Sequence, residues 1–132
     1  MKAQPSVTVL AYAGCDTCKR ALRWLAANGI EADVRAIVDA PPTVAELGVW
    51  IPASGLSPRK WLNTSGQSYR ALGKLAVDAA SDRELVAWLA KDGKLVRRPV
   101  LIARAMLAEE PPGAAVTVLV GFSEASYARL LA

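Results

Sequence analysis

Hydrophobic and polar residues in the first third of the chain follow the pattern of a strand, a helix and a second strand. An apolar run covers about 6–12, and a helical pattern follows over about 16–28, where Asn28 and Gly29 form a common helix stop. Charged and apolar residues then alternate over about 30–38, which is typical of a half-buried strand. This order predicts two parallel strands joined by a crossover helix.

The middle of the chain, over 43–92, is predicted to be a block of helices inserted between strands. Its first and last helices each begin with a capping box, in which an N-cap hydroxyl pairs with a glutamate three residues later. These boxes are formed by Thr43 with Glu46 and by Ser81 with Glu84. The other expected features are an interruption of the first helix at Pro52 and Gly55, a helix restart at Ser57 and Pro58, and a short helix over 67–74.

Two apolar runs near the end of the chain predict two further strands. One follows Pro99 directly, and the other covers 116–120. The proline and glycine residues of 111–113 favour a turn between them, so the second strand is expected to return antiparallel to the first. Ser123 is the expected N-cap of a final helix over about 124–131.

Length and composition favour one folded α/β domain. The chain has 132 residues, of which 53% are hydrophobic, so it can bury a sizeable core and lacks the composition of a disordered chain. We therefore expect 1–132 to form a single domain that contains 43–92 as a helical insertion. Because no apolar run approaches the roughly 20 residues that span a bilayer, and no signal-peptide pattern precedes the first strand, we expect no membrane partner and a cytoplasmic location.

The charge of the chain gives little support for nucleic-acid binding. Its formal net charge is +4, and the excess is spread evenly over both halves without a basic tail. Nucleic-acid binding usually requires a concentrated basic patch or stripe, so no direct nucleic-acid partner is expected. A mild positive charge leaves the binding of small anions open.

The two cysteines of the chain, Cys15 and Cys18, form a C-x-x-C motif between the first predicted strand and helix. A helix N-terminus carries free N–H groups and roughly half a positive charge, which favours a thiolate. Lys19 and Arg20 add positive charge nearby. The spacing places the second cysteine one helical turn after the first, within disulfide reach. In a reducing compartment such a pair is usually functional.

Three other interpretations of the cysteine pair are a structural disulfide, two inert buried thiols and half of a zinc site. Zinc requires two further ligands, yet the chain has no histidine and no second cysteine pair, so no metal is expected. A C-x-x-C motif beside a strand–helix–strand pattern is typical of thioredoxin-like redox proteins. We therefore favour a redox or nucleophilic role for Cys15 and Cys18.

The C-x-x-C is one of several motifs that occur in order along the chain. They read Gly14-Cys15-Asp16-Thr17-Cys18, Leu62-Asn63-Thr64-Ser65-Gly66, Tyr69-Arg70-Ala71-Leu72, Arg97-Arg98-Pro99-Val100-Leu101 and Val120-Gly121-Phe122. Together they resemble the arsenate reductase/Spx (ArsC-like) family over about 6–131, and the last motif is closest in appearance to the YffB-like branch. The resemblance implies a thioredoxin-like fold, with a four-stranded mixed sheet flanked by helices and a helical insertion.

The resemblance also implies roles for particular residues. Cys15 aligns with the family's nucleophilic cysteine, and Arg98 and Pro99 align with an Arg-Pro pair whose proline is typically cis and faces the cysteine loop. Arg70 aligns with a second arginine, and the two arginines help to hold the substrate anion beside the thiolate. Guanidinium groups suit this task because they neutralise charge and donate paired hydrogen bonds. By themselves, Arg98 could be a solvated strand end and Arg70 a helix-surface charge.

Two departures from the family pattern bear on function. The family's arsenate reductases generally use one active-site cysteine with external glutathione, whereas this chain also has Cys18, as Spx-type regulators do. These reductases also carry a third arginine after the Arg-Pro strand, and 117–122 contains none. A site with two arginines suits glutathione or a mixed disulfide better than arsenate.

The resemblance therefore implies a thiol-dependent oxidoreductase without a bound cofactor. Its Cys15 thiolate would attack an arsenic oxyanion or a glutathione mixed disulfide, and the adduct would be resolved by Cys18, by glutathione as co-substrate, or by a glutaredoxin. The alternative is an Spx-like redox-sensing regulator that binds RNA polymerase, with a Cys15–Cys18 disulfide as its switch. A third alternative is a glutathione-binding or interaction module with little activity. Turnover distinguishes an enzyme from the other two.

Overall fold

A four-stranded mixed sheet forms the centre of the computed structural model, which describes residues 6–104 and 116–131. The strand order is β2 (Asp33–Ala36), β1 (Ser6–Ala11), β3 (Val100–Arg104) and β4 (Val116–Val120). β1 and β2 are parallel, whereas β3 is antiparallel to both β1 and β4. The predicted thioredoxin-like sheet, its parallel first pair and its antiparallel last strand are confirmed. The turn predicted over 111–113 lies outside the described residues.

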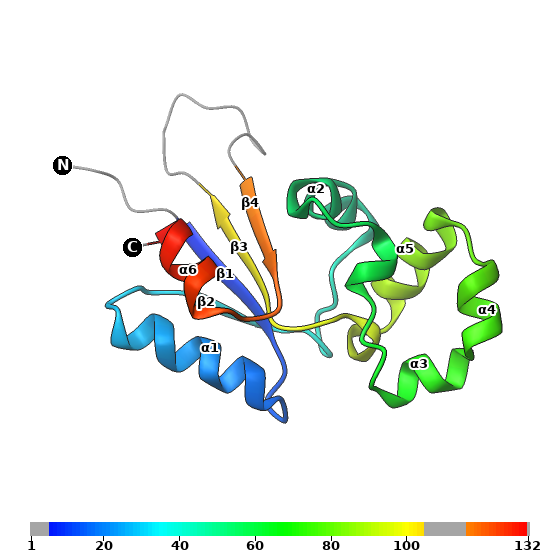
Figure 1. The fold of residues 1–132 in the computed structure, drawn as a ribbon, viewed down its shortest axis with the longest axis horizontal. Helices are drawn as coiled ribbons and strands as arrows, with labels where there is room; N and C mark the ends of the chain where they lie inside the picture. Colours follow the sequence, from blue (N-terminus) through cyan, green and yellow to red (C-terminus); the bar gives the residue numbers. More distant parts are fainter. Residues whose placement is uncertain (1–5, 105–115, 132) are drawn as a thin grey trace.

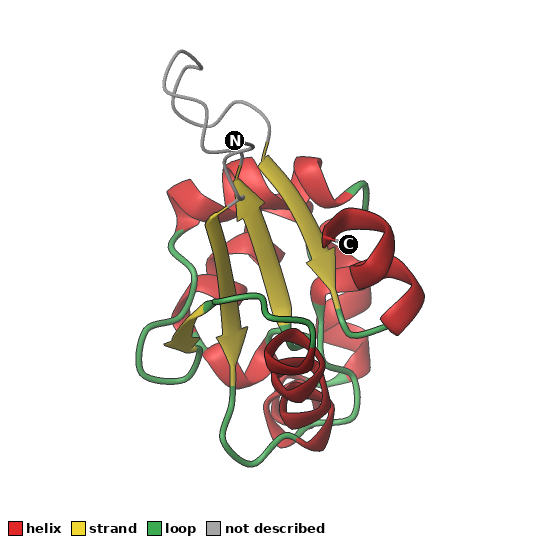
Figure 2. Cartoon of the chain, turned by 90° about the vertical axis from the view of Figure 1, so that its left-hand side faces the viewer, coloured by secondary structure: helices red, strands yellow, loops and turns green. Residues whose placement is uncertain are grey.

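Helices cover both faces of the sheet (Figures 1 and 2). One face carries α1 (Asp16–Ala27) and α6 (Glu124–Leu131), and the other faces the helices from the middle of the chain. These are α2 (Val44–Ser54), the 3-10 turn η1 (Pro58–Trp61), α3 (Gln67–Leu72), α4 (Lys74–Ala79), α5 (Asp82–Lys91) and the 3-10 turn η2 (Gly93–Leu95). Among the described residues, no helix is long and apolar enough to cross a membrane.

The central strand β1 has two buried faces because successive side chains of a strand point to opposite sides of the sheet. Val9 and Ala11 belong to the apolar cluster beneath α1 and α6. Leu10 belongs to the second cluster, on the face covered by α2 and α5. A strand buried on both faces has a largely apolar sequence, and β1 is apolar apart from Ser6 and Thr8, which is why it could be predicted at almost its observed length.

Both predicted capping boxes are present. Thr43 and Ser81 each accept a hydrogen bond from the backbone N–H of the glutamate three residues later, and that glutamate accepts one from the N-cap N–H. Ser123 likewise accepts a hydrogen bond from the Ser126 N–H, at 3.3 Å, at the start of α6. These helix starts depend on contacts within one turn, so the sequence alone specifies them.

Several predicted boundaries are wrong. α2 is not interrupted at Pro52 but continues to Ser54, and Gly55 ends it with φ 73°. The missing N–H of Pro52 is tolerated because this face of the helix is exposed, so water can reach the released carbonyl. The helix predicted to restart after Ser57 is a 3-10 turn. Gly73, with φ 86°, separates α3 from α4, which was not predicted. The second strand is shorter than predicted and covers only Asp33–Ala36.

Candidate active site

Cys15 is the N-cap residue of α1. Its backbone is extended, with φ −100° and ψ 115°, and its Sγ accepts a hydrogen bond from the Cys18 backbone N–H at 3.2 Å. The side chain is partly exposed, so a substrate can reach the sulfur. One of the first free N–H groups of the helix therefore donates to an accessible sulfur, at the end of the helix where negative charge is favoured.

Cys18 differs sharply from Cys15, although it lies only one turn further along α1. It is a free thiol with 1% of its surface exposed, on the buried face of the helix. Burial raises the pKa of the Cys18 thiol to about 12, with smaller contributions from its hydrogen bond to Cys15 and from the Cys15 charge. Within the part of the chain that the structure describes, no three His, Cys, Asp or Glu side chains gather as a candidate metal site.

Arg98 and Pro99 lie beside the cysteine loop. The peptide bond between them is cis, as the family resemblance implies. Pro99 is buried, and its carbonyl accepts a hydrogen bond from the Gly121 N–H at 2.8 Å. The positive charge of Arg98 lowers the pKa of Cys18, opposing the larger effect of burial. The structure therefore brings together Cys15, Cys18 and the Arg-Pro pair.

The guanidinium of Arg98 stacks on Tyr12, a residue to which the sequence reasoning gave no role. The Arg98 Cζ lies 4.9 Å from the centre of the Tyr12 ring. Its Nη1 donates to the Lys94 carbonyl at 3.2 Å, and its Nε is buried with no hydrogen-bond partner among the described residues. The only signal in the sequence was the position of an aromatic residue, Tyr12, just before the cysteine loop. The local sequence pattern does not show that Arg98 is its partner.

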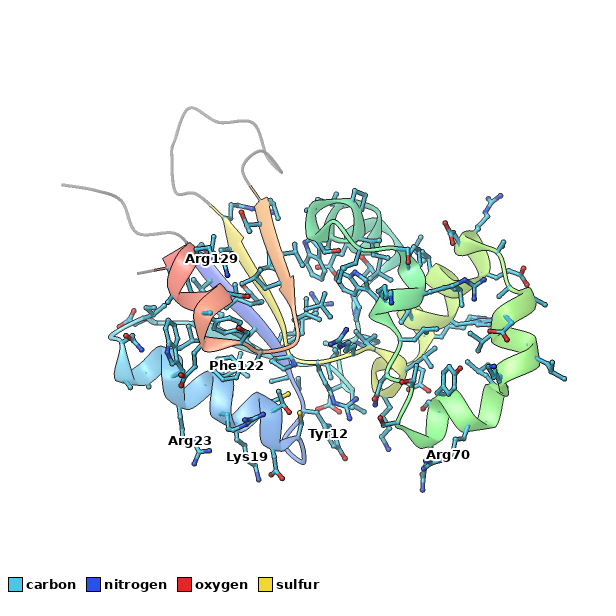
Figure 3. All side chains as sticks on the ribbon, viewed as in Figure 1. Tyr12, Lys19, Arg23, Arg70, Phe122 and Arg129 are labelled. Atoms are coloured by element: carbon cyan, nitrogen blue, oxygen red, sulfur yellow. The ribbon has the colours of Figure 1, made fainter. Side chains whose placement is uncertain are left out.

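Arg70 lies apart from this group. It is exposed on α3, where its Nη1 donates to the Ser65 carbonyl at 3.3 Å. Figure 3 shows Arg70 below α3, well separated from Tyr12 and Lys19 and directed away from the protein. The structure thus does not bring Arg70 to the cysteines, and its role in binding an anion stays a prediction.

A solvent-open groove of about 720 Å³ lies between α1 and the start of α6. Arg20 and Arg23 line it on the α1 side, together with Trp24, and Phe122 lines it on the other side. Neither cysteine lines the groove, but Phe122 and Cys15 border the same apolar cluster. The groove therefore adds positive charge and aromatic surface near the cysteine loop rather than a second reaction centre.

Comparison with known proteins identifies the family. The sequence profile of the ArsC family matches residues 10–130. This chain belongs to the ArsC family. It is 38% identical over 96 residues to the uncharacterized protein YusI of Bacillus subtilis, covering 72% of this chain and 81% of YusI. It is 32% identical over 98 residues to an arsenate reductase of Rhizobium meliloti, covering 74% of this chain and 69% of that enzyme.

Solved structures share the fold of this ArsC-family chain. An ArsC family related protein from Bacteroides fragilis is 40% identical, with a TM-score of 0.79 over 95% of this chain and 97% of the other. A protein titled YffB is 23% identical, with a TM-score of 0.74 over 96% of this chain and 100% of the other. At that identity, the second similarity is one of fold.

Proposed function

We propose that this protein is a thiol-dependent oxidoreductase in which Cys15 is the nucleophile and Cys18 the resolving thiol. The observation that carries the proposal is the inequality of the two thiols. Cys15 is partly exposed at a helix N-terminus, whereas Cys18 is 1% exposed and burial raises its pKa to about 12. An electrophile from solvent therefore meets Cys15 first. The similarity to arsenate reductases supports a reductase.

The proposed reaction with a glutathione mixed disulfide has two exchange steps. The Cys15 thiolate attacks the glutathione sulfur, forms a Cys15–glutathione disulfide and releases the substrate as a thiolate. The Cys18 thiolate then attacks the Cys15 sulfur and releases glutathione as a thiolate, which leaves a Cys15–Cys18 disulfide. The substrate has gained two electrons and the protein has lost two. A glutaredoxin or another external dithiol then reduces the Cys15–Cys18 disulfide and so returns two electrons to the protein.

With arsenate, the same Cys15 thiolate would form a sulfur–arsenic bond while water leaves. A second thiol, from Cys18 or glutathione, then attacks the Cys15 sulfur, so that arsenic is reduced to arsenite and a disulfide forms. We favour the mixed disulfide because only Arg98 of the two proposed arginines stands beside the cysteines. A mixed disulfide carries its charges away from the reacting sulfur, whereas arsenate carries them at the reacting atom.

The environment of Cys18 supports this order of events. Its pKa is raised mainly by burial, and then by its hydrogen bond to Cys15 and the Cys15 charge. The last two contributions disappear once Cys15 enters a disulfide, so Cys18 ionises more readily after the first step than before it. The Arg98 charge lowers the same pKa and favours the resolving thiolate.

The surrounding charges support an anionic, glutathione-linked substrate. Among the described residues, Arg98 donates to the protein through Nη1 alone, and Arg20 and Arg23 outnumber Glu124 in the lining of the nearby groove. Guanidinium groups of this kind bind carboxylates. We therefore propose glutathione as co-substrate and glutaredoxin as a reducing partner, in the cytoplasm, where thiols are kept reduced.

A coupled turnover assay tests the proposed function. It contains NADPH, glutathione, glutathione reductase and glutaredoxin, and compares arsenate with a glutathione mixed disulfide as substrate. Glutathione and glutaredoxin reduce a mixed disulfide directly, so the rate without this protein is subtracted. Above that rate, we expect turnover with the mixed disulfide by the wild-type protein and none by Cys15→Ser. We expect Cys18→Ser to keep part of the rate and to depend more strongly on glutathione, which replaces the lost resolving thiol.

Each contrary outcome of this assay has a distinct meaning. Turnover by Cys15→Ser at the wild-type rate would exclude Cys15 as the nucleophile. Equal loss in both variants would exclude resolution by glutathione. A third outcome is no turnover with either substrate, together with ready formation of a Cys15–Cys18 disulfide. This result would favour the redox-switch alternative over an enzyme. A pull-down of RNA polymerase by the oxidised protein would then test that alternative.

A further inference from the structure

The ring of Tyr12 touches both the cysteine loop and Arg98. On one side, the Arg98 Cζ lies 4.9 Å from the ring centre. On the loop side, a Cβ added to Gly14 would lie only 2.8 Å from the ring Cε2. The Tyr12 carbonyl also accepts a hydrogen bond from the Cys15 N–H at 3.0 Å. Tyr12 therefore connects the nucleophile's loop with the neighbouring arginine.

Few other contacts restrain the Arg98 side chain. Its Nη1 donates to the Lys94 carbonyl at 3.2 Å, and no carboxylate pairs with it among the described residues, where the ion pair found is Arg35 with Glu46. A long side chain with one backbone hydrogen bond retains considerable rotamer freedom. Stacking on an aromatic face is comparable in strength to a hydrogen bond, so Tyr12 supplies a large part of the restraint.

The way in which Tyr12 holds Arg98 leaves the guanidinium free to act. A carboxylate partner would neutralise the charge and occupy N–H groups, whereas an aromatic ring contacts the face and uses no donor. Among the described residues, only Nη1 of the guanidinium donates to a protein acceptor, so other N–H groups of the partly exposed Arg98 stay available for an anion. We infer that Tyr12 is a positioning residue that holds Arg98 beside Cys15 for an anionic substrate; this role rests on the proposed function.

Gly14 provides an independent way to test this contact. Its φ is not in the left-handed region, so the backbone does not require glycine there. The Tyr12 ring does require glycine at this position, because a Cβ on residue 14 would lie 2.8 Å from the ring Cε2, closer than such atoms approach in proteins. Gly14→Ala should therefore displace the ring while leaving the Tyr12 and Arg98 side chains chemically intact.

The experiment compares Tyr12→Phe, Tyr12→Leu and Gly14→Ala, each with and without Arg98→Ala. The first readout is kcat/KM in the coupled assay. The second is the pH profile of iodoacetamide alkylation at Cys15, for which each variant also carries Cys18→Ser. Tyr69→Leu serves as a matched control, since Tyr69 is a partly buried aromatic residue that packs against the same apolar cluster as Tyr12 but lies on α3. Thermal unfolding checks that each variant is folded.

We expect Tyr12→Leu and Gly14→Ala to lower kcat/KM by roughly 2- to 30-fold, the range of a cation–π interaction, and to move the alkylation profile to higher pH. Tyr12→Phe keeps the ring and should restore both readouts to near the wild-type values. In the Arg98→Ala background, Tyr12→Leu should add no further change, because the contact is already lost. A merely structural role would lower the unfolding temperature but would not depend on Arg98.

Wild-type values of both readouts in Tyr12→Leu and Gly14→Ala would overturn the inference, as would an undiminished effect of Tyr12→Leu in the Arg98→Ala background. Alkylation requires no substrate, so this readout separates the inference from the proposed function. Absence of turnover in the wild-type protein contradicts the proposed function, while the alkylation profiles still decide whether Tyr12 acts through Arg98.

Discussion

Burial separates the chemistry of two thiols that lie one helical turn apart. Cys18 shares the inward face of α1 with Ala21 and Leu25, at helical spacing, and all three are 0–1% exposed. Cys15 precedes the helix and stays partly exposed. The same C-x-x-C motif thus gives one accessible sulfur and one protected sulfur, and this difference assigns their proposed roles.

The raised pKa of Cys18 predicts a pH dependence of stability. Below the ordinary value of 9.0, the thiol is protonated in both the folded and the unfolded chain; above it, the unfolded chain loses the proton while the folded chain, with a pKa of about 12, keeps it. The free energy of unfolding should therefore fall as pH rises from 9 to 12, by at most about 1.4 kcal/mol per pH unit from this group.

Urea unfolding of a Cys15→Ser protein at pH 7.5, 9 and 10.5, with and without Cys18→Ala, measures this contribution. We expect the protein with Cys18 to lose more stability above pH 9 than the Cys18→Ala variant, and the two curves to run parallel below pH 9. Other groups that titrate in this range are common to both proteins. Parallel curves over the whole range would show that Cys18 is not protected in the folded state.

The candidate site residues could be predicted from sequence to different degrees. Cys15 and Cys18 were identified from the motif and its position between a strand and a helix, and Arg98 from the family resemblance. Tyr12 was missed because its partner is distant in sequence, and only the fold shows that they meet. Different roles for the two cysteines were also predicted, but the near-complete burial of Cys18 was not, although its spacing to Ala21 places both on one helix face.

At the scale of elements, a cluster of contacts around Arg35 fixes the path from β2 into α2. Its Nη1 and Nη2 donate to the two carboxylate oxygens of Glu46 at 2.8 and 2.9 Å, and its Nε donates to the Ala40 carbonyl at 2.8 Å. Glu46 is also the glutamate of the Thr43 capping box. One carboxylate therefore caps α2 and joins it to the sheet.

Glu46→Gln should lower the free energy of unfolding at pH 7 by about 1–2 kcal/mol, because it removes a charge-assisted pair that is partly exposed. Glu84→Gln is the matched control, since Glu84 has the same place in the other capping box and no arginine partner among the described residues. Urea unfolding should show a smaller loss in the control.

Low pH should reduce the difference in the free energy of unfolding between the wild-type protein and Glu46→Gln. The hydrogen bond with Arg35 lowers the pKa of Glu46 below its usual value of 4.5, so the pair stabilises the fold above that value, and its contribution disappears as pH falls through the lowered value. We expect the difference in stability between Glu46→Gln and the wild-type protein to shrink as pH falls from 5 to 3. An unchanged difference between them at pH 3 would contradict an ionic origin.

Element boundaries depended on contacts that the sequence pattern does not contain. The second strand was predicted over 30–38, but its pairing ends at Ala36, opposite Ala11, because β1 ends there and the chain turns into the cysteine loop. α4 was missed because only Gly73 separates it from α3, and short helices carry weak periodicity. The capping boxes were right because they depend on neighbouring residues alone.

At the scale of the whole molecule, sheet register assembles the site. Leu10 near the end of β1 is paired with Val100 at the start of β3, and Val100 is paired with Val120 at the end of β4. The cysteine loop, Arg98 with Pro99, and Gly121 therefore meet at one end of the sheet. The sequence pattern predicted each strand, but their register and the central place of β1 came only from the structure.

The most direct test of the account is to trap the first covalent step. The Cys18→Ser protein is treated with oxidised glutathione near neutral pH, and the product is examined by intact mass and peptide mapping. We predict one glutathione per chain, attached to Cys15, whereas the wild-type protein should release it and form the Cys15–Cys18 disulfide. Failure of Cys15 to become modified, or equally fast modification of Cys18 in the Cys15→Ser protein, would contradict the central claim that Cys15 is the nucleophile and Cys18 the protected resolving thiol.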